Sequence, residues 1–194
     1  MGRFVLSDAA PLICLAQVDG LSWLKAIFGR VHLTEQVRDE IIVGLNKPGE
    51  DALAAAIKRR TLRVHTEWRW TEPEFPDLGR GEESCIAAAV NLTRRGHECL
   101  LLIDDREGRR RASALSITIT GTAAIIGAAK QRRLIPSARE AFAVLREKGF
   151  RVSESIVEGI LESVGETPAA AEARDAVGPS TASRVKPAKP RRKR

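Results

Sequence analysis

Short apolar runs alternate along the chain with longer segments whose apolar residues recur every three or four positions. The short runs predict β-strands at residues 4–6, 30–33, 62–65, 100–103 and 117–119. The longer segments predict helices at residues 11–28, 34–45, 49–59, 81–95, 106–115, 122–132, 137–148 and 153–164. Because strands that alternate with helices form covered parallel sheets, we expect an α/β fold of three layers, with a central parallel sheet flanked by helices on both faces.

The periodic pattern ends near residue 165. Residues 166–194 are rich in Ala, Pro, Ser, Thr and charge, with too few large apolar side chains to offset the entropy lost on ordering. We therefore expect one domain over residues 1–165 and a disordered basic tail over residues 166–194. The 32 Lys and Arg exceed the 25 Asp and Glu by the seven basic residues of 184–194, a segment without acids. The domain is thus neutral, which excludes a uniformly basic surface that coats nucleic acid.

The cysteines and the apolar runs indicate which cellular compartment the protein suits. Cys14, Cys85 and Cys99 form no CxxC pair and have mostly apolar neighbours, so we interpret them as buried thiols rather than a disulfide framework or a zinc site. Apolar runs such as residues 100–103 fall far short of the ~20 residues of a membrane span, and the N-terminus lacks the order of a signal peptide. We expect a cytoplasmic protein without a membrane partner.

Acidic residues follow two of the predicted strands. Asp8 comes after the first strand, and Asp104 and Asp105 come directly after the apolar strand at 100–103. In an open parallel sheet, ligands bind beyond the carboxyl ends of the strands, so these acids are candidates for a site. Asp8 and Asp105 also suit a second role, as N-caps of the helices that follow them.

Two further acids lie on predicted helices. In the helix at 81–95, Glu82 projects from the middle of the apolar stripe, while Glu83 lies about a quarter turn away. In an earlier helix, Glu40 lies at the edge of the apolar stripe, beside Gly44, and it could also be an ordinary solvated acid. Its neighbour Asp39 points away from the stripe, toward solvent.

Carboxylates from these separate segments can converge above one sheet, and we predict a catalytic set of Asp8, Glu40, Glu82 and Asp104. Two such charges ~4 Å apart repel by roughly 4 kcal/mol at an effective dielectric of 20, a cost that a divalent cation removes. Oxygen ligands suit Mg²⁺ or Mn²⁺, for which we predict the ligands Asp8, Glu82, Asp104 and Asp105. No histidine follows an acid-bearing strand or forms an HxxxH pair, which argues against zinc.

Groups that can bind phosphate stand next to these acids. Thr122 opens a helix directly after a strand, and four arginines occupy the first turns of the helix after Asp104, namely Arg106, Arg109, Arg110 and Arg111. The arginines could equally form a solvated helix face. Carboxylates flanked by phosphate binders fit phosphodiester hydrolysis, whereas GxGxxG, GxxxxGK[ST] and GxSxG are missing from the sequence.

Residues 68–76 (WRWTEPEFP) have no period, contain two prolines and predict a surface loop. Its two tryptophans could stack on bases, but packing against the edge of the domain is the favoured interpretation.

Four stretches together resemble the PIN-domain ribonucleases, in particular the VapC-like toxins of toxin-antitoxin modules: VLSDAAPLICLAQVDGLSWLKAIFGRVHLTEQVRDEI, GRGEESCIAAAV, LLLIDDREGRRRA and TITGTAAIIGAAKQRRLIP. The resemblance covers residues 3–165. It implies a parallel sheet between helices and an acidic pocket for Mg²⁺ or Mn²⁺, with family positions matched by Asp8, Glu40, Glu82, Asp104, Asp105 and Thr122. Glu82 stands where many members have Asp, and the basic tail lies outside the family pattern.

The sequence therefore predicts a metal-dependent endoribonuclease that leaves a 5′-phosphate, acting on RNA as the toxin of a toxin-antitoxin module. Expected partners are RNA, a cognate antitoxin protein and a second copy of the chain in a homodimer. The alternative is a non-catalytic nucleic-acid-binding module with the same fold, in which the tail supplies phosphate contacts. A response-regulator receiver is disfavoured, because its acid pair should follow the first strand, where this chain has Ser7, Asp8 and Ala9.

Overall fold

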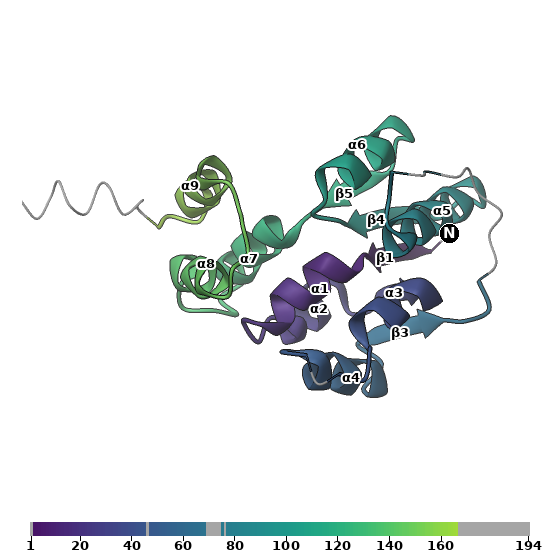
Figure 1. The fold of residues 1–194 in the computed structure, drawn as a ribbon. Coiled ribbons are helices and arrows are strands. Elements are labelled where there is room, and N and C mark those ends of the chain that lie inside the picture. Colours follow the sequence, from purple (N-terminus) through teal and green to yellow (C-terminus); the bar gives the residue numbers. More distant parts are fainter. Residues whose placement is uncertain (1, 46, 69–74, 76, 167–194) are drawn as a thin grey trace, which may run out of the picture.

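The computed structural model describes residues 2–45, 47–68, 75 and 77–166. The predicted tail at 166–194 therefore lies almost wholly outside the described residues, as does the second tryptophan of the predicted loop, Trp70. In the described part, the strands form one parallel sheet in the order β3-β2-β1-β4-β5 (Figure 1). They are β1 (Arg3–Ser7), β2 (Val31–Thr34), β3 (Leu62–His65), β4 (Glu98–Leu102) and β5 (Thr118–Thr120).

Helices cover both faces of this sheet. They are α1 (Ala9–Ala16), α2 (Leu21–Phe28), α3 (Glu35–Ile41), α4 (Glu50–Lys58), α5 (Arg80–Arg94), α6 (Arg106–Ala114), α7 (Thr122–Gln131), α8 (Ala138–Glu147) and α9 (Glu154–Ser163). The helices α1, α2, α4 and α7 pack together on one face, α5 and α6 cover the other, and α3 lies against α5 (Figure 1). The three-layer α/β fold is confirmed.

The core follows from the strand sequences. The central strands β1 and β4 pair along their whole length, and their carboxyl halves are fully buried. The largest side chains buried between sheet and helices are Leu6, Leu12, Leu15, Leu24, Leu33, Leu53, Leu62, Ile86, Leu101, Leu102, Ile103 and Ile125. Of the thiols expected to be buried, Cys14 and Cys85 are buried, but Cys99 is partly exposed.

The helix predicted at 11–28 was wrong, because the chain breaks there into α1 and α2. Asp19 adopts a left-handed φ of 55°, which no helix can continue through. Gly20 follows, and a Cβ at this position would lie 2.9 Å from the ring of Trp23, so the turn needs a residue without a side chain.

The helix predicted at 34–45 ends early, at Ile41. Beyond it Gly44 takes a left-handed φ of 71° and donates its N–H to the Glu50 carboxylate at 2.6 Å. The sequence pattern placed Glu40 beside Gly44 on one helix face. This placement was wrong, because the helix ends before Gly44.

The helices α8 and α9 pack on α7, at one end of the sheet (Figure 1). Glu166 fixes the start of α8, because its carboxylate accepts the N–H groups of Ala138 and Arg139 at 2.8 and 2.9 Å. Although burial opposes the change, these hydrogen bonds lower the pKa of Glu166 to about 2.

No single helix in the described part of the chain is long and apolar enough to cross a membrane; α1 and α2 reach that length and composition only as a pair bent by 116°.

Candidate active site

Asp8 and Asp104 lie at the ends of the two central strands. Ser7 on β1 stands in register with Leu102 on β4, and the N–H of Asp8 donates to the carbonyl of Leu102 at 2.9 Å. The carboxyl edge of the sheet thus carries both acids, as the sequence predicted.

Asp8 is a buried carboxylate with one oxygen that lacks a donor. Its Oδ2 caps α1 by accepting the N–H of Ala10 at 3.4 Å, and the residue is only 3% exposed. Its Oδ1 is buried, and no described residue donates a hydrogen bond to it. Burial, and to a lesser degree the negative charges of Glu82 and Glu40, raise the pKa of Asp8 to about 6.

Glu40 and Glu82 reach this edge from α3 and α5. Glu40 Oε1 accepts the N–H of Gly81 at 2.8 Å, and a Cβ on that glycine would lie 2.5 Å from Glu40 Oε2, so α5 begins directly against Glu40. Glu82 Oε2 accepts the N–H of Gly79 at 3.1 Å. Burial, followed by the charges of Asp105 and Glu40, raises the pKa of Glu82.

Glu83 has a structural role that the helix pattern did not reveal. Its Oε1 accepts the N–H of Phe75 at 3.0 Å, so it ties the segment before α5 to that helix. The contact joins residues outside the helical repeat, where a pattern of apolar positions carries no signal.

Asp104 faces α7 and is held there by Thr122. The N–H of Thr122 donates to Asp104 Oδ1 at 2.8 Å, and its hydroxyl donates to Oδ2 at 2.5 Å. Between them along the chain, Gly121 has no room for a side chain, because a Cβ would lie 2.6 Å from Asp104 Oδ1. The Thr122 hydroxyl, predicted to bind phosphate, is thus engaged by a carboxylate.

Asp105 is an N-cap, as the alternative interpretation proposed. Its Oδ1 accepts the N–H groups of Glu107 and Gly108, both at 2.9 Å, at the start of α6. Asp8 is likewise an N-cap, so both acids cap helices. Capping uses one oxygen of each carboxylate, and the charge of Asp105 still acts on Glu82.

The four arginines divide into two pairs. Arg109 Nη1 donates to the carbonyls of Ile103 and Thr120, at 2.9 and 3.3 Å, and so ties the ends of β4 and β5 beside Asp104. Arg106 is exposed on the first turn of α6 and lines the cavity described below. In contrast, Arg110 and Arg111 are both paired with Glu107.

A protein-family model described as a PIN domain matches residues 4–166. The chain belongs to the PIN domain family. PIN domains are generally nucleases, so the coarse assignment of this chain as a nuclease-type hydrolase follows from the match. No curated protein matches the chain in sequence.

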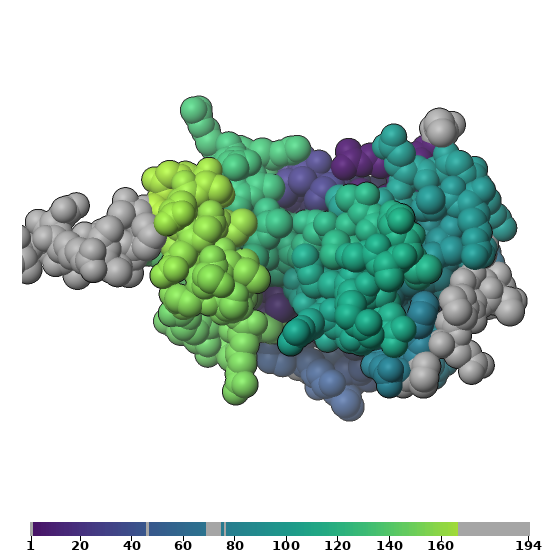
Figure 2. Space-filling model, turned by 90° about the horizontal axis from the view of Figure 1, so that it is seen from above, coloured from purple at the N-terminus to yellow at the C-terminus, as the bar shows by residue number. Residues whose placement is uncertain are grey.

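The PIN domain has a cavity of about 840 Å³ beside Asp104. Its polar wall contains Asp104, Asp105, Arg106, Arg109 and Thr122, and α8 and α9 with their connection supply a wall that contains Leu145, Phe150, Arg151, Val152, Ile156 and Ile160. Figure 2 shows a hollow between α6 and α9, with atoms of the N-terminal part of the chain visible at its base. Sequence reasoning missed the second wall, because its apolar positions look like any helix face that packs on a core.

Cys14 lies on α1 in the same cavity. Burial, and then the charge of Asp104, raise the pKa of this thiol to about 12. A thiol that stays protonated is a poor nucleophile, so this environment disfavours cysteine chemistry.

The carboxylates fit a divalent cation in part. Within residues 2–45, 47–68, 75 and 77–166, no three His, Cys, Asp or Glu side chains lie where they could share one ion. Asp104 is held toward Thr122. The donor set nevertheless consists of carboxylate oxygens, and Asp8 Oδ1 is buried without a donor. A buried carboxylate oxygen of this kind is a ligand atom for a hard cation.

Proposed function

We propose that this PIN domain is a metal-dependent endoribonuclease. The observation that carries the proposal is the buried carboxylate of Asp8 at the centre of the sheet. One of its oxygens has no hydrogen-bond donor, and the negative charges of Glu82 and Glu40 act on it. The folded protein would be more stable with a neutral or fully paired side chain at this position. An unpaired buried acid therefore points to a functional role.

The proposed ligands of Mg²⁺ or Mn²⁺ are Asp8, Glu82, Asp104 and Asp105. A bound divalent cation polarises the scissile phosphate and lowers the pKa of an attacking water. Glu40 joins the catalytic set from α3, where it also fixes the start of α5 through the N–H of Gly81.

The chain's own groups prepare the reaction. The carboxyl group of Asp8 must lose its proton before it can act as a ligand, and its pKa of about 6 makes that loss nearly complete at neutral pH. Arg106 and Arg109 present cationic groups to the cavity that contains Asp104, and they suit the phosphate of the substrate. The apolar residues of α9 form a wall against which bases can pack.

The reaction is in-line hydrolysis. Water attacks phosphorus, the bond from phosphorus to O3′ breaks, and the 3′-oxygen leaves as a hydroxyl, so that the downstream fragment keeps a 5′-phosphate. The non-catalytic alternative is less favoured, because a binding module gains nothing from a buried carboxylate that repels its neighbours.

The test is incubation of the full chain with a panel of end-labelled RNAs in Mg²⁺, in Mn²⁺ and in chelator. We expect cleavage that requires the cation, 5′-phosphate ends, and loss of cleavage in Asp8→Asn. Asp19→Asn is the matched control, since Asp19 is an exposed acid in the turn before α2. Cleavage that persists in chelator, or that leaves a cyclic phosphate, would contradict the proposal.

A role as the toxin of a toxin-antitoxin module, with an antitoxin protein as partner and a homodimeric toxin in the cytoplasm, belongs to the same proposal and rests on the resemblance of the four sequence stretches. Growth arrest on expression, relieved by the product of an adjacent small reading frame, is the expected result.

A further inference from the structure

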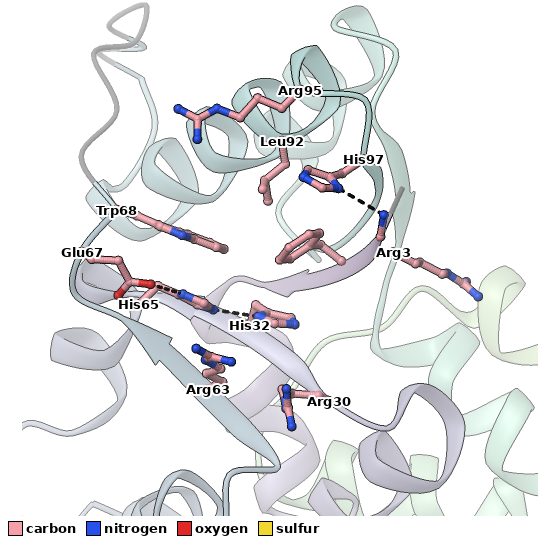
Figure 3. Close-up of a pocket in the computed structure, with 12 residues that line it drawn as sticks. Arg3, Arg30, His32, Arg63, His65, Glu67, Trp68, Leu92, Arg95 and His97 are labelled. Atoms are coloured by element: carbon pink, nitrogen blue, oxygen red, sulfur yellow. Dashed lines mark hydrogen bonds and ion pairs between the residues drawn. The ribbon is translucent and has the colours of Figure 1, made fainter.

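A second cavity, of about 690 Å³, lies beside the amino-terminal ends of β1, β2 and β4 and extends to the end of β3, under the end of α5 (Figure 3). It is lined by Gly2, Arg3, Phe4, Arg30, His32, Arg63, His65, Glu67, Trp68, Leu92, Arg95 and His97. We call this the amino-edge cavity. None of its residues belongs to the predicted catalytic set, and its volume lies in the range of small-ligand sites.

The strand register explains why these side chains meet. His32 on β2 pairs with Arg63 on β3 and also stands opposite Leu6 on β1. Because alternate residues of a strand share a face, Phe4, His32, Arg63 and His65 all project toward α5. The opposite face of β2 carries Val31 and Leu33, which are buried in the core.

The aromatic rings of the cavity form a stack. The ring of Trp68 lies 3.9 Å from that of His65 at an angle of 9°, and the ring of His32 follows at 5.0 Å from His65. Phe4 lies beside His32, and Phe4 and Trp68 are each only partly buried. Trp68 thus packs against the domain edge, as the sequence analysis favoured, and it also presents an aromatic wall to this cavity.

Hydrogen bonds hold the two histidines in place. His65 Nδ1 is 2.6 Å from Glu67 Oε1, and His65 Nε2 is 2.8 Å from His32 Nδ1. With Glu67 as acceptor, His65 donates from Nδ1 and accepts at Nε2, so His32 is the donor between the rings. The stack is therefore fixed before any ligand arrives.

The cavity also carries an excess of positive charge. Four arginines line it, namely Arg3, Arg30, Arg63 and Arg95, whereas Glu67 is its one acid among the described residues. Figure 3 shows Arg30 and Arg63 next to each other beside the histidines, with Arg95 across the cavity at the end of α5. Burial, followed by electrostatic interactions with His65, Arg30 and Arg63, lowers the pKa of His32 to about 4. An anion between these arginines would relieve that repulsion.

We propose that the amino-edge cavity binds a nucleotide unit, with its base against the aromatic wall and its phosphate on Arg30 and Arg63. Stacked aromatic side chains take planar bases without sequence preference, and arginine matches phosphate with two parallel hydrogen bonds. The unit can come from a free nucleotide or from an RNA strand. This site does not rest on the proposed nuclease activity.

The histidine NMR signals give a direct test. All three histidines of the chain line this cavity and none lines the cavity beside Asp104, so their imidazole resonances report on the amino-edge cavity. The full chain, with chelator present, is titrated with AMP, adenosine, inorganic phosphate and tetraglutamate. We expect AMP to shift all three histidine signals and to bind at least about tenfold more tightly than adenosine or phosphate. No shift with AMP, or equal affinity for phosphate or tetraglutamate, would overturn the proposal.

Variants distinguish the phosphate contact of the arginines from the base contact of Trp68. Arg30→Gln with Arg63→Gln should weaken AMP binding at least about tenfold, whereas Arg59→Gln with Arg94→Gln, which removes two exposed arginines outside the cavity, should change it by less than about twofold. Trp68→Leu should reduce the affinity for AMP to that for phosphate. Equal loss in both arginine pairs would indicate a general charge effect and overturn the assignment.

An RNA arm identifies the source. Single-stranded pentaadenylate that binds at least about tenfold more tightly than AMP, with the same histidine shifts, assigns the site to an RNA strand. Comparable affinities assign it to a free nucleotide. Binding of pentaadenylate without histidine shifts, together with no response to AMP, would overturn the site, whatever the outcome of the nuclease assay.

Discussion

Thr122 binds both oxygens of the Asp104 carboxylate, one through its N–H at 2.8 Å and the other through its hydroxyl at 2.5 Å. The start of α7 thereby fixes the acid at the end of β4. Thr122 is 3% exposed, so the hydroxyl has no competition from bulk water. We interpret Thr122 as a positioning residue for Asp104 rather than as a phosphate binder.

Removal of the hydroxyl should therefore misplace Asp104. A hydrogen bond to a charged group contributes about 1.5–3 kcal/mol, which corresponds to roughly a tenfold to hundredfold loss of cleavage in Thr122→Val. Thr122→Ser keeps the hydroxyl and should restore most of the rate. Single-turnover cleavage of an RNA substrate measures both, and failure of serine to rescue would indicate that packing of the methyl group matters instead.

Asp104→Asn tests the acid itself. An asparagine can accept the N–H of Thr122 and donate to its hydroxyl, so the fold should survive with an unchanged thermal midpoint. Loss of a metal ligand should nevertheless reduce cleavage by several orders of magnitude, since each ~1.4 kcal/mol is tenfold in rate. Retention of more than about a tenth of the parental rate would rule out Asp104 as a ligand.

Asp8 should make the cation-free protein less stable as the pH rises. Its folded pKa of about 6 lies above the ordinary aspartate value of 3.8, so the native state binds the proton more tightly than the unfolded chain does. The stability that comes from this proton is lost between about pH 4 and pH 6. At ~1.4 kcal/mol per pKa unit, Asp8→Asn should gain up to about 3 kcal/mol over the parent across this range. Urea unfolding in chelator, from pH 4.5 to 7.5, measures the difference.

His32 acts in the opposite direction over the same range. Its folded pKa of about 4 lies below 6.5, so its contribution is present above pH 6.5 and is lost as the pH falls toward 4. Both proteins carry His32, and its effect therefore cancels in the comparison. A difference between Asp8→Asn and parent that does not change with pH would contradict a raised pKa at Asp8.

Glu82 and Glu83 should respond differently to the same change. Glu82→Gln removes a charge from a repelling group, so the cation-free stability should hold or rise, while metal-dependent cleavage is lost and Mg²⁺ stabilises the variant less than the parent. Glu83→Gln keeps an oxygen that can accept the N–H of Phe75, so activity and stability should change little. Thermal unfolding with and without Mg²⁺, alongside cleavage, distinguishes them.

The sequence predicted the strands to within two residues, because a strand buried on both faces is a short run of apolar residues. The residues after β1 and β4 were therefore placed correctly at the carboxyl edge. Local patterns failed where the conformation of one residue decides the path of the chain. Asp19 breaks the helix predicted at 11–28, and the contact between Gly44 and Glu50 lies where the helix predicted at 34–45 has already ended. Neither feature changes the spacing of the apolar residues.

Contacts between distant segments were the least predictable. His32 and His65 are 33 residues apart and meet only because β2 and β3 are neighbours in register. A histidine that follows an acid-bearing strand can be recognised from the sequence, but this cluster forms from strands that carry no predicted acid. In the same way, the direction of the Asp104 carboxylate depends on Thr122, which follows a different strand.

A single methyl group added at Gly121 should displace the Asp104 carboxylate. A Cβ there would lie 2.6 Å from Asp104 Oδ1 and 3.2 Å from Arg109 Nη1, while the φ of −145° is open to any residue. Gly121→Ala should therefore push the carboxylate off Thr122 and reduce cleavage at least about tenfold. Overpacking should also lower the free energy of unfolding by about 1–3 kcal/mol.

Gly159→Ala is the control, because nothing lies within 4 Å of a Cβ at that position inside α9. It should keep full activity and gain about 0.5–1 kcal/mol, since alanine favours a helix over glycine. Equal activity of the two variants in single-turnover cleavage would show that the position of the Asp104 carboxylate does not limit the reaction.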